Sequence, residues 1–142
     1  MRLIGALTIA ALAACGGQAD QEGADMAMSG MDNPMAADSV ALTAKNESGI
    51  TGNAVLAEAG DSVTVTVMLR GATAGAAYPN HVHHGTCDSP GGVAAPLTSV
   101  TAGSDGTGTA TTTVARAAVE GDAKLVQVHL PGGQTAACGE IS

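Results

Sequence analysis

The chain has 142 residues, a length typical of one domain, and carries 13 Asp and Glu against 5 Lys and Arg. A formal net charge of −8 leaves no basic patch for phosphate groups, so nucleic acid is not expected as a partner. The chain has no Phe, no Trp and one Tyr, so its core has to be built from Val, Leu, Ile and Ala.

The N-terminus has the pattern of an export signal. Arg2 precedes a short apolar run that ends in Leu12-Ala-Ala-Cys15, and this run is too short to span a bilayer. The ending resembles a bacterial lipobox, which implies cleavage before Cys15 and acylation of its thiol. Residues 1–14 are therefore predicted to be a lipoprotein signal peptide. Several acyl chains would anchor the mature protein in the cell envelope, on the periplasmic or outer side of a bacterial membrane. The alternative is an ordinary secretory signal with an incidental cysteine.

Residues 15–37 are predicted to form a disordered tether, because they are rich in Gly, Ala, Asp, Gln and Ser and show no apolar period. Four methionines stand in this polar stretch, where no core exists to hold them: Met26, Met28, Met31 and Met35. Thioethers are soft ligands that suit Cu(I), so one interpretation is a flexible copper-catching segment. The other is biased composition in an unstructured tail.

Residues 38–142 are predicted to form one all-β domain. Short segments with a period of two and many Val and Thr residues are separated by turns rich in Gly, Asp and Asn. Eight segments fit strands: 39–44, 54–57, 62–69, 80–84, 97–101, 107–114, 124–130 and 135–141. No window holds a helical apolar stripe of useful length. The pattern predicts an antiparallel β-sandwich or flattened barrel of about eight strands.

All four histidines fall in two of these strands. Residues two apart on a strand share a face, so His81 and His83 project together while Val82 points into the core. His129 lies opposite the apolar face of its own strand. Three converging imidazoles would suit copper or zinc. The alternative is that they are merely solvated. His84 points away from the pair and would become a fourth ligand only if the strand ended at His83.

Two cysteines remain once Cys15 is lipidated, namely Cys87 and Cys138. In an oxidising compartment such a pair is expected to form a disulfide. A loop of this length would stabilise the fold by roughly 4 kcal/mol in the chain-entropy model. The alternative is that the two thiols act as soft copper ligands.

Five motifs in order resemble the copper/zinc superoxide dismutase family over roughly residues 78 to 141. They are His81-Val-His83, Cys87-Asp-Ser-Pro-Gly-Gly, Ser99-Val-Thr-Ala-Gly-Ser-Asp-Gly106, Val126-Gln-Val-His129 and Ala136-Ala-Cys138-Gly-Glu-Ile141. The resemblance implies a Greek-key sandwich of eight strands. It also implies that His81, His83 and His129 bind copper, and that Cys87 and Cys138 form an intramolecular disulfide.

The sequence departs from the family at three positions. Val93 stands where the family has the histidine that bridges copper and zinc, and Gly103 replaces the zinc-binding aspartate. Thr135 replaces the arginine that helps to draw superoxide to the copper. One copper ion and no zinc are therefore expected, and electrostatic steering of an anion should be poor.

Three further residues close to these motifs have less specific expectations. Asp88 and Glu140 are expected to be solvated surface charges, although a carboxylate near a metal site often orients a histidine ligand. Tyr78 is expected to be a packing residue.

The sequence predicts an extracytoplasmic copper-binding lipoprotein with a superoxide dismutase-like domain and, at most, weak dismutation of superoxide. The alternatives are a protein that buffers or delivers copper without catalysis, and a non-catalytic envelope module. The membrane, through the lipid anchor, and a copper ion are the expected partners.

Overall fold

A computed structural model describes residues 37–142 of the chain, which form an all-β domain of eight strands. The strands are β1 (Ala37–Ala44), β2 (Thr51–Ala59), β3 (Ser62–Arg70), β4 (Ala77–Gly85), β5 (Pro90–Thr101), β6 (Gly108–Ala115), β7 (Lys124–His129) and β8 (Thr135–Ile141). One turn of 3-10 helix, η1 (Arg116–Ala118), follows β6. The predicted signal peptide with Cys15, and the four methionines of the tether, lie outside the described residues. Within 37–142 no helix is long and apolar enough to cross a membrane.

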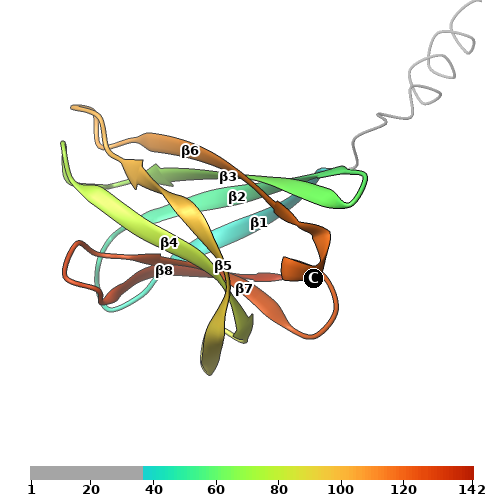
Figure 1. Ribbon diagram of the computed structural model, residues 1–142. Coiled ribbons are helices and arrows are strands. Elements are labelled where there is room, and N and C mark those ends of the chain that lie inside the picture. Colours follow the sequence, from blue (N-terminus) through green and yellow to red (C-terminus); the bar gives the residue numbers. More distant parts are fainter. Residues whose placement is uncertain (1–36) are drawn as a thin grey trace, which may run out of the picture. The chain divides into compact units, whose positions relative to one another are not determined.

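The strands form one antiparallel sheet that curls into a nearly closed barrel (Figure 1). Their order is β5-β4-β7-β8-β1-β2-β3-β6, so β3 lies beside β6 and β4 beside β7, as in Greek-key connections. The two edge strands meet through a bond in which the Thr98 amide donates to the Thr112 hydroxyl over 2.7 Å. The predicted fold class is confirmed.

Alternation of apolar and mostly polar residues makes β3 a barrel strand with one buried face. Val63, Val65, Val67 and Leu69 are each 1% exposed, while the threonines between them lie on the outer side. The core has one aromatic side chain, Tyr78, whose hydroxyl accepts a bond from the Thr73 amide over 2.7 Å. Small apolar side chains therefore fill this barrel, as the composition requires.

The largest differences from the sequence-based expectation are in β5 and β7. β5 begins at Pro90, seven residues before the predicted segment, because Pro90-Gly-Gly continues to pair with β4 through irregular register. β7 is buried on both faces, although the pattern predicted burial only of the valine face. Its central place between β4 and β8 buries Leu125 and Gln127 as well.

A disulfide joins Cys87, in the loop between β4 and β5, to Cys138 on β8. A hydrogen bond also links this loop to β8, because the Cys87 amide donates to the Glu140 carboxylate over 2.9 Å. The loop leads directly into the start of β5, so these two contacts fix the segment that runs beside the histidines of β4.

Candidate metal centre

His81, His83 and His129 come together on the outer face of two adjacent strands. His81 and His83 lie two residues apart on β4, and His129 ends β7. His81 is directly opposite Gln127, which places His129 diagonally across from it on the same face. One ring nitrogen from each residue lies within 4.8 Å of the others, so a single metal ion could contact all three.

Two of the three imidazoles are oriented by backbone carbonyls. His83 Nδ1 lies 3.0 Å from the Gly91 carbonyl oxygen, and His129 Nδ1 lies 3.1 Å from that of Gly133. A carbonyl can only accept, so Nδ1 of each ring carries the proton and Nε2 of each ring has a free lone pair. This is the arrangement that commonly prepares a histidine for a metal ion.

The third imidazole, His81, has no such support. Its Nδ1 is buried and lacks a hydrogen-bond partner in residues 37–142, and the same holds for Nε2 of His83. Burial, followed by the charges that His129 and His83 can carry, lowers the pKa of His81 below its ordinary value. A neutral imidazole with a free, buried lone pair is a metal donor, because only the unprotonated nitrogen can bind an ion.

The buried, unpaired nitrogens test whether the three residues fit a metal ion. Buried polar atoms are nearly always hydrogen-bonded, and an orphaned one costs free energy. A metal ion between Nδ1 of His81 and Nε2 of His83 would satisfy both atoms, and Nε2 of His129 would complete a three-nitrogen set. The residues present therefore fit a metal ion.

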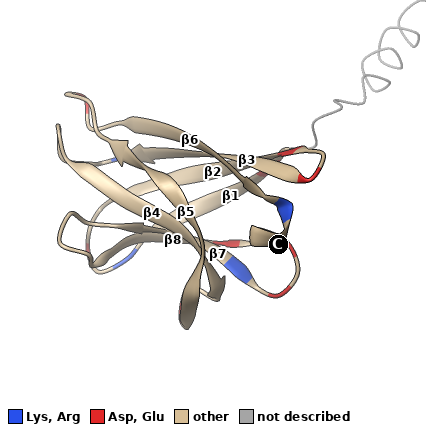
Figure 2. Cartoon of the chain, viewed as in Figure 1, with Lys and Arg blue, Asp and Glu red and all other residues tan. Residues whose placement is uncertain are grey.

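Uncharged residues surround the three-His group. Five residues lie directly opposite the histidines on the neighbouring strands: Pro96, Val93, Gln127, Leu125 and Thr135. Neither β4 nor β5 contains Lys, Arg, Asp or Glu, and both strands are free of charged residues in Figure 2. An ion here would interact mainly with the imidazoles.

Of the three residues at which the sequence departs from the motifs of copper/zinc superoxide dismutases, two lie beside the histidines and one does not. Val93, 53% exposed, is opposite His83, and Thr135 is opposite His129. Gly103 instead lies in the turn between β5 and β6, where its amide donates to the Thr107 carbonyl. The three-His group is the one cluster of metal-binding side chains found among the described residues.

The remaining candidates lie outside this group. His84 is exposed, and it lies outside the trio because the strand continues to Gly85, which places its side chain on the face opposite that of His81 and His83. The side chain of Asp88 is 96% exposed and 3.4 Å from the Lys45 ammonium. The Glu140 carboxylate accepts from the Cys87 amide. Neither carboxylate is hydrogen-bonded to a histidine.

Sequence reasoning missed the carbonyls of Gly91 and Gly133. Backbone acceptors leave no residue-type signal, since every residue carries one. A partial signal did exist: one Gly-Gly pair begins eight residues after His83, at 91–92, and another begins three residues after His129, at 132–133. The pair at 132–133 lies in the turn between β7 and β8, and the pair at 91–92 lies in the irregularly paired start of β5.

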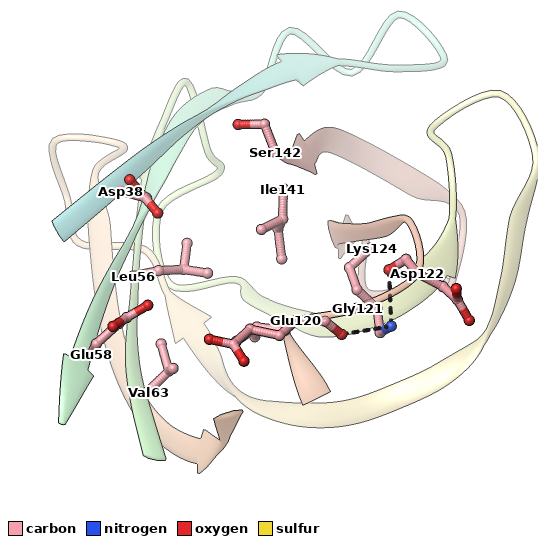
Figure 3. Close-up of a pocket in the computed structure, with 11 residues that line it drawn as sticks. Asp38, Leu56, Glu58, Val63, Glu120, Gly121, Asp122, Lys124, Ile141 and Ser142 are labelled. Atoms are coloured by element: carbon pink, nitrogen blue, oxygen red, sulfur yellow. Dashed lines mark hydrogen bonds between the residues drawn. The ribbon is translucent and has the colours of Figure 1, made fainter. Parts of the chain in front are cut away.

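One cavity lies at a different place, lined by residues of β1, β2, β3 and β8, by the start of β7 and by the loop before it (Figure 3). Its volume is about 290 Å³, and none of the histidines lines it. Lys124 in its wall is only 5% exposed, and its ammonium donates to the carbonyls of Glu120 and Asp122. Because this buried charge is already bonded within the loop, the cavity has no comparable unsatisfied group.

Comparison with known proteins adds no family assignment. Neither a protein-family model nor a curated protein sequence matches the chain. The findings thus define an eight-stranded antiparallel near-barrel with a disulfide and a three-His group that could hold a metal ion.

Proposed function

We propose that this protein binds one copper ion through His81, His83 and His129. One observation carries the proposal: a ring nitrogen from each of the three histidines lies within 4.8 Å of the others, and the group also has two buried ring nitrogens, Nδ1 of His81 and Nε2 of His83, without a hydrogen-bond partner in the described part of the chain. Two carbonyls already hold the rings of His83 and His129 in the tautomer that a metal ion requires.

Copper is favoured over zinc by the resemblance to copper/zinc superoxide dismutases. Three imidazoles alone would suit either metal. The family's ordered motifs now coincide with an eight-stranded near-barrel, a Cys87–Cys138 disulfide and a clustered trio at the positions of the copper ligands. Val93 and Gly103 stand where the family places zinc ligands, so the proposed site takes copper and no neighbouring zinc.

The surroundings of the trio support metal holding more than rapid catalysis. Bound copper would supply one-electron chemistry by alternating between two oxidation states, which is what dismutation of superoxide needs. This chain contributes a neutral rim to such a site. Thr135 opposite His129 offers no positive charge, so a small anion would not be concentrated there. Copper buffering or delivery is therefore the primary role, with weak dismutation at most.

The protein is proposed to act in the cell envelope, tethered through Cys15. The disulfide supports an oxidising compartment. The Met26–Met35 stretch would capture copper near the membrane and increase the supply to the domain.

Metal analysis of the protein isolated from its native envelope tests the proposal. We expect about one copper and no structural zinc per chain, together with an EPR spectrum of the oxidised form that shows nitrogen ligands. The same sample should have low dismutase activity. Equimolar zinc alongside copper, or an absence of copper that persists after reconstitution, would contradict the assignment.

A further inference from the structure

We infer that the three-His site binds Cu(I) more tightly than Cu(II), and that Val93 is the residue that sets this preference. The inference rests on the proposed copper binding and goes beyond it, because it assigns the oxidation state in which the ion is held.

The number of ligands in the three-His site suits Cu(I). Cu(I) is a d10 ion without a strong geometric preference, and three nitrogen donors satisfy it. Cu(II) prefers square-planar or tetragonal sites and needs at least a fourth donor. The metal-binding group in the described residues contains three side chains, each giving one nitrogen. Residues 37–142 thus supply the complete set for Cu(I) and an incomplete set for Cu(II).

Val93 occupies the position from which a fourth donor could come. Val93 is paired with His83 across β4 and β5, at a place where the register shifts on both sides, so the backbones of these two residues are neighbours on adjacent strands. Val93 is 53% exposed, and it is the one exposed large apolar residue among residues 37–142. A hydrocarbon therefore occupies the position next to the trio where a donor would complete a four-coordinate site.

The charge of the ion also favours Cu(I) over Cu(II) at this site. Moving an ion out of water costs free energy in proportion to the square of its charge, so Cu(II) costs about four times as much as Cu(I) in the same surroundings. No carboxylate among the residues directly opposite the trio offsets that cost. Glu140 shares a cross-strand row with His83, but Leu125 lies between them, which separates their backbones by about 10 Å. The Glu140 carboxylate already accepts from the Cys87 amide.

The experiment compares Cu(I) and Cu(II) affinities of the exported chain. Competition with bicinchoninate under anaerobic conditions with ascorbate gives the Cu(I) affinity, and competition with nitrilotriacetate gives that for Cu(II). The tether methionines are replaced by leucine in every sample, so that thioether-bound Cu(I) does not contribute. Mass analysis after the titration checks that the disulfide is intact.

We expect Cu(I) to bind at least about tenfold more tightly than Cu(II), relative to the two ions in water, which raises the midpoint potential by about 59 mV or more. Val93→His adds an imidazole opposite His83 and should raise Cu(II) affinity at least about tenfold over Cu(I), lowering the potential by about 59 mV. Val93→Thr, which has nearly the same shape but no imidazole, is the matched control and should leave the ratio unchanged.

The outcomes separate the two proposals. Equal affinity for both ions, or a Val93→His variant whose ratio equals that of Val93→Thr, would overturn the inference while leaving copper binding intact. If a His83→Ala variant bound copper of both oxidation states as tightly as the parent chain, the proposed function itself would fail. Val93 is exposed on an edge strand, so both variants at this position should fold, and circular dichroism checks that they do.

Discussion

His129 and Thr135 lie directly opposite each other where β7 turns into β8. The Thr135 hydroxyl accepts a bond from Gln127 Nε2 over 2.7 Å, which keeps this side chain beside the trio. A hydroxyl at this place gives an approaching anion no positive charge, and the rest of the protein is acidic.

Replacing this hydroxyl by a guanidinium should increase superoxide dismutation. We expect Thr135→Arg to raise the rate of the copper-loaded protein by about tenfold at low ionic strength, because a cation beside the site concentrates the anion. The gain should shrink toward 0.1 M salt, where the Debye length is about 10 Å. Pulse radiolysis at several salt concentrations measures it.

The control for this experiment is Thr111→Arg, which adds the same charge on the outer side of β6. It should have little effect, because β6 contributes no residue to the trio. If the two variants gained equally, net charge rather than local charge would govern the rate. Turnover near the diffusion limit by the unmodified protein would contradict the argument altogether.

Loss of one histidine should identify the ligand set. His129→Ala should weaken copper binding far more than His84→Ala, because His129 contributes a nitrogen to the group and His84 lies outside it. Isothermal titration with competing chelator compares the two variants. Equal losses would mean that His84 is a ligand and that the strand ends earlier in solution than in the structure.

Much of this architecture follows from the sequence, because strand periodicity is a local property. The alternation in Ser62–Arg70 predicts β3 at nearly its observed bounds, and the shared face of His81 and His83 follows from the same period. The convergence of His129 with that pair needed the strand order, which the motif resemblance implied and which periodicity alone could not supply.

The parts that escaped prediction depend on backbone geometry and on tertiary neighbours. The carbonyls of Gly91 and Gly133 orient His83 and His129 only because the start of β5 lies beside β4 and the turn after β7 folds back onto its strand. The extended start of β5 was hidden because Pro90-Gly-Gly has the composition of a turn, yet the disulfide and the Glu140 bond hold this segment against β4. Both are contacts between residues far apart in the sequence.

The disulfide should contribute a large share of the domain's stability. Removing it in a Cys87→Ser/Cys138→Ser variant should cost about 4 kcal/mol in the chain-entropy model for a loop of this size. At roughly 4 °C or more per kcal/mol for a small domain, the melting temperature should fall by well over 10 °C. Differential scanning calorimetry of metal-free protein measures this directly.

The copper affinity of the same variant shows whether the disulfide also affects the three-His site. The loop that carries Cys87 leads to Gly91, whose carbonyl orients His83, so the variant should also bind copper more weakly while still folded at low temperature. Coincident unfolding curves for the parent and the variant would show that the bridge constrains little in solution.

The stability of the metal-free domain should depend on pH through His81. Burial and the two neighbouring imidazoles lower its pKa in the folded state below the ordinary value of 6.5. Below about pH 6.5 the unfolded chain takes up a proton on this ring, whereas the folded domain resists doing so. The unfolded state then binds more protons, and the free energy of unfolding falls as the pH falls. Above about pH 6.5 both states hold a neutral ring, and the effect disappears.

His81→Gln removes the titrating group and should flatten this part of the pH profile, while His84→Gln, at an exposed position, should leave it unchanged. Urea unfolding between pH 5 and 8, with metal removed by chelation, gives the three profiles. Carboxylates titrate in the lower part of this range, but they are common to all three proteins and cancel in the difference. If the difference between the parent and His81→Gln did not change with pH, the folded-state pKa of His81 would be normal. The view that this ring is held neutral for a metal ion would then lose its support.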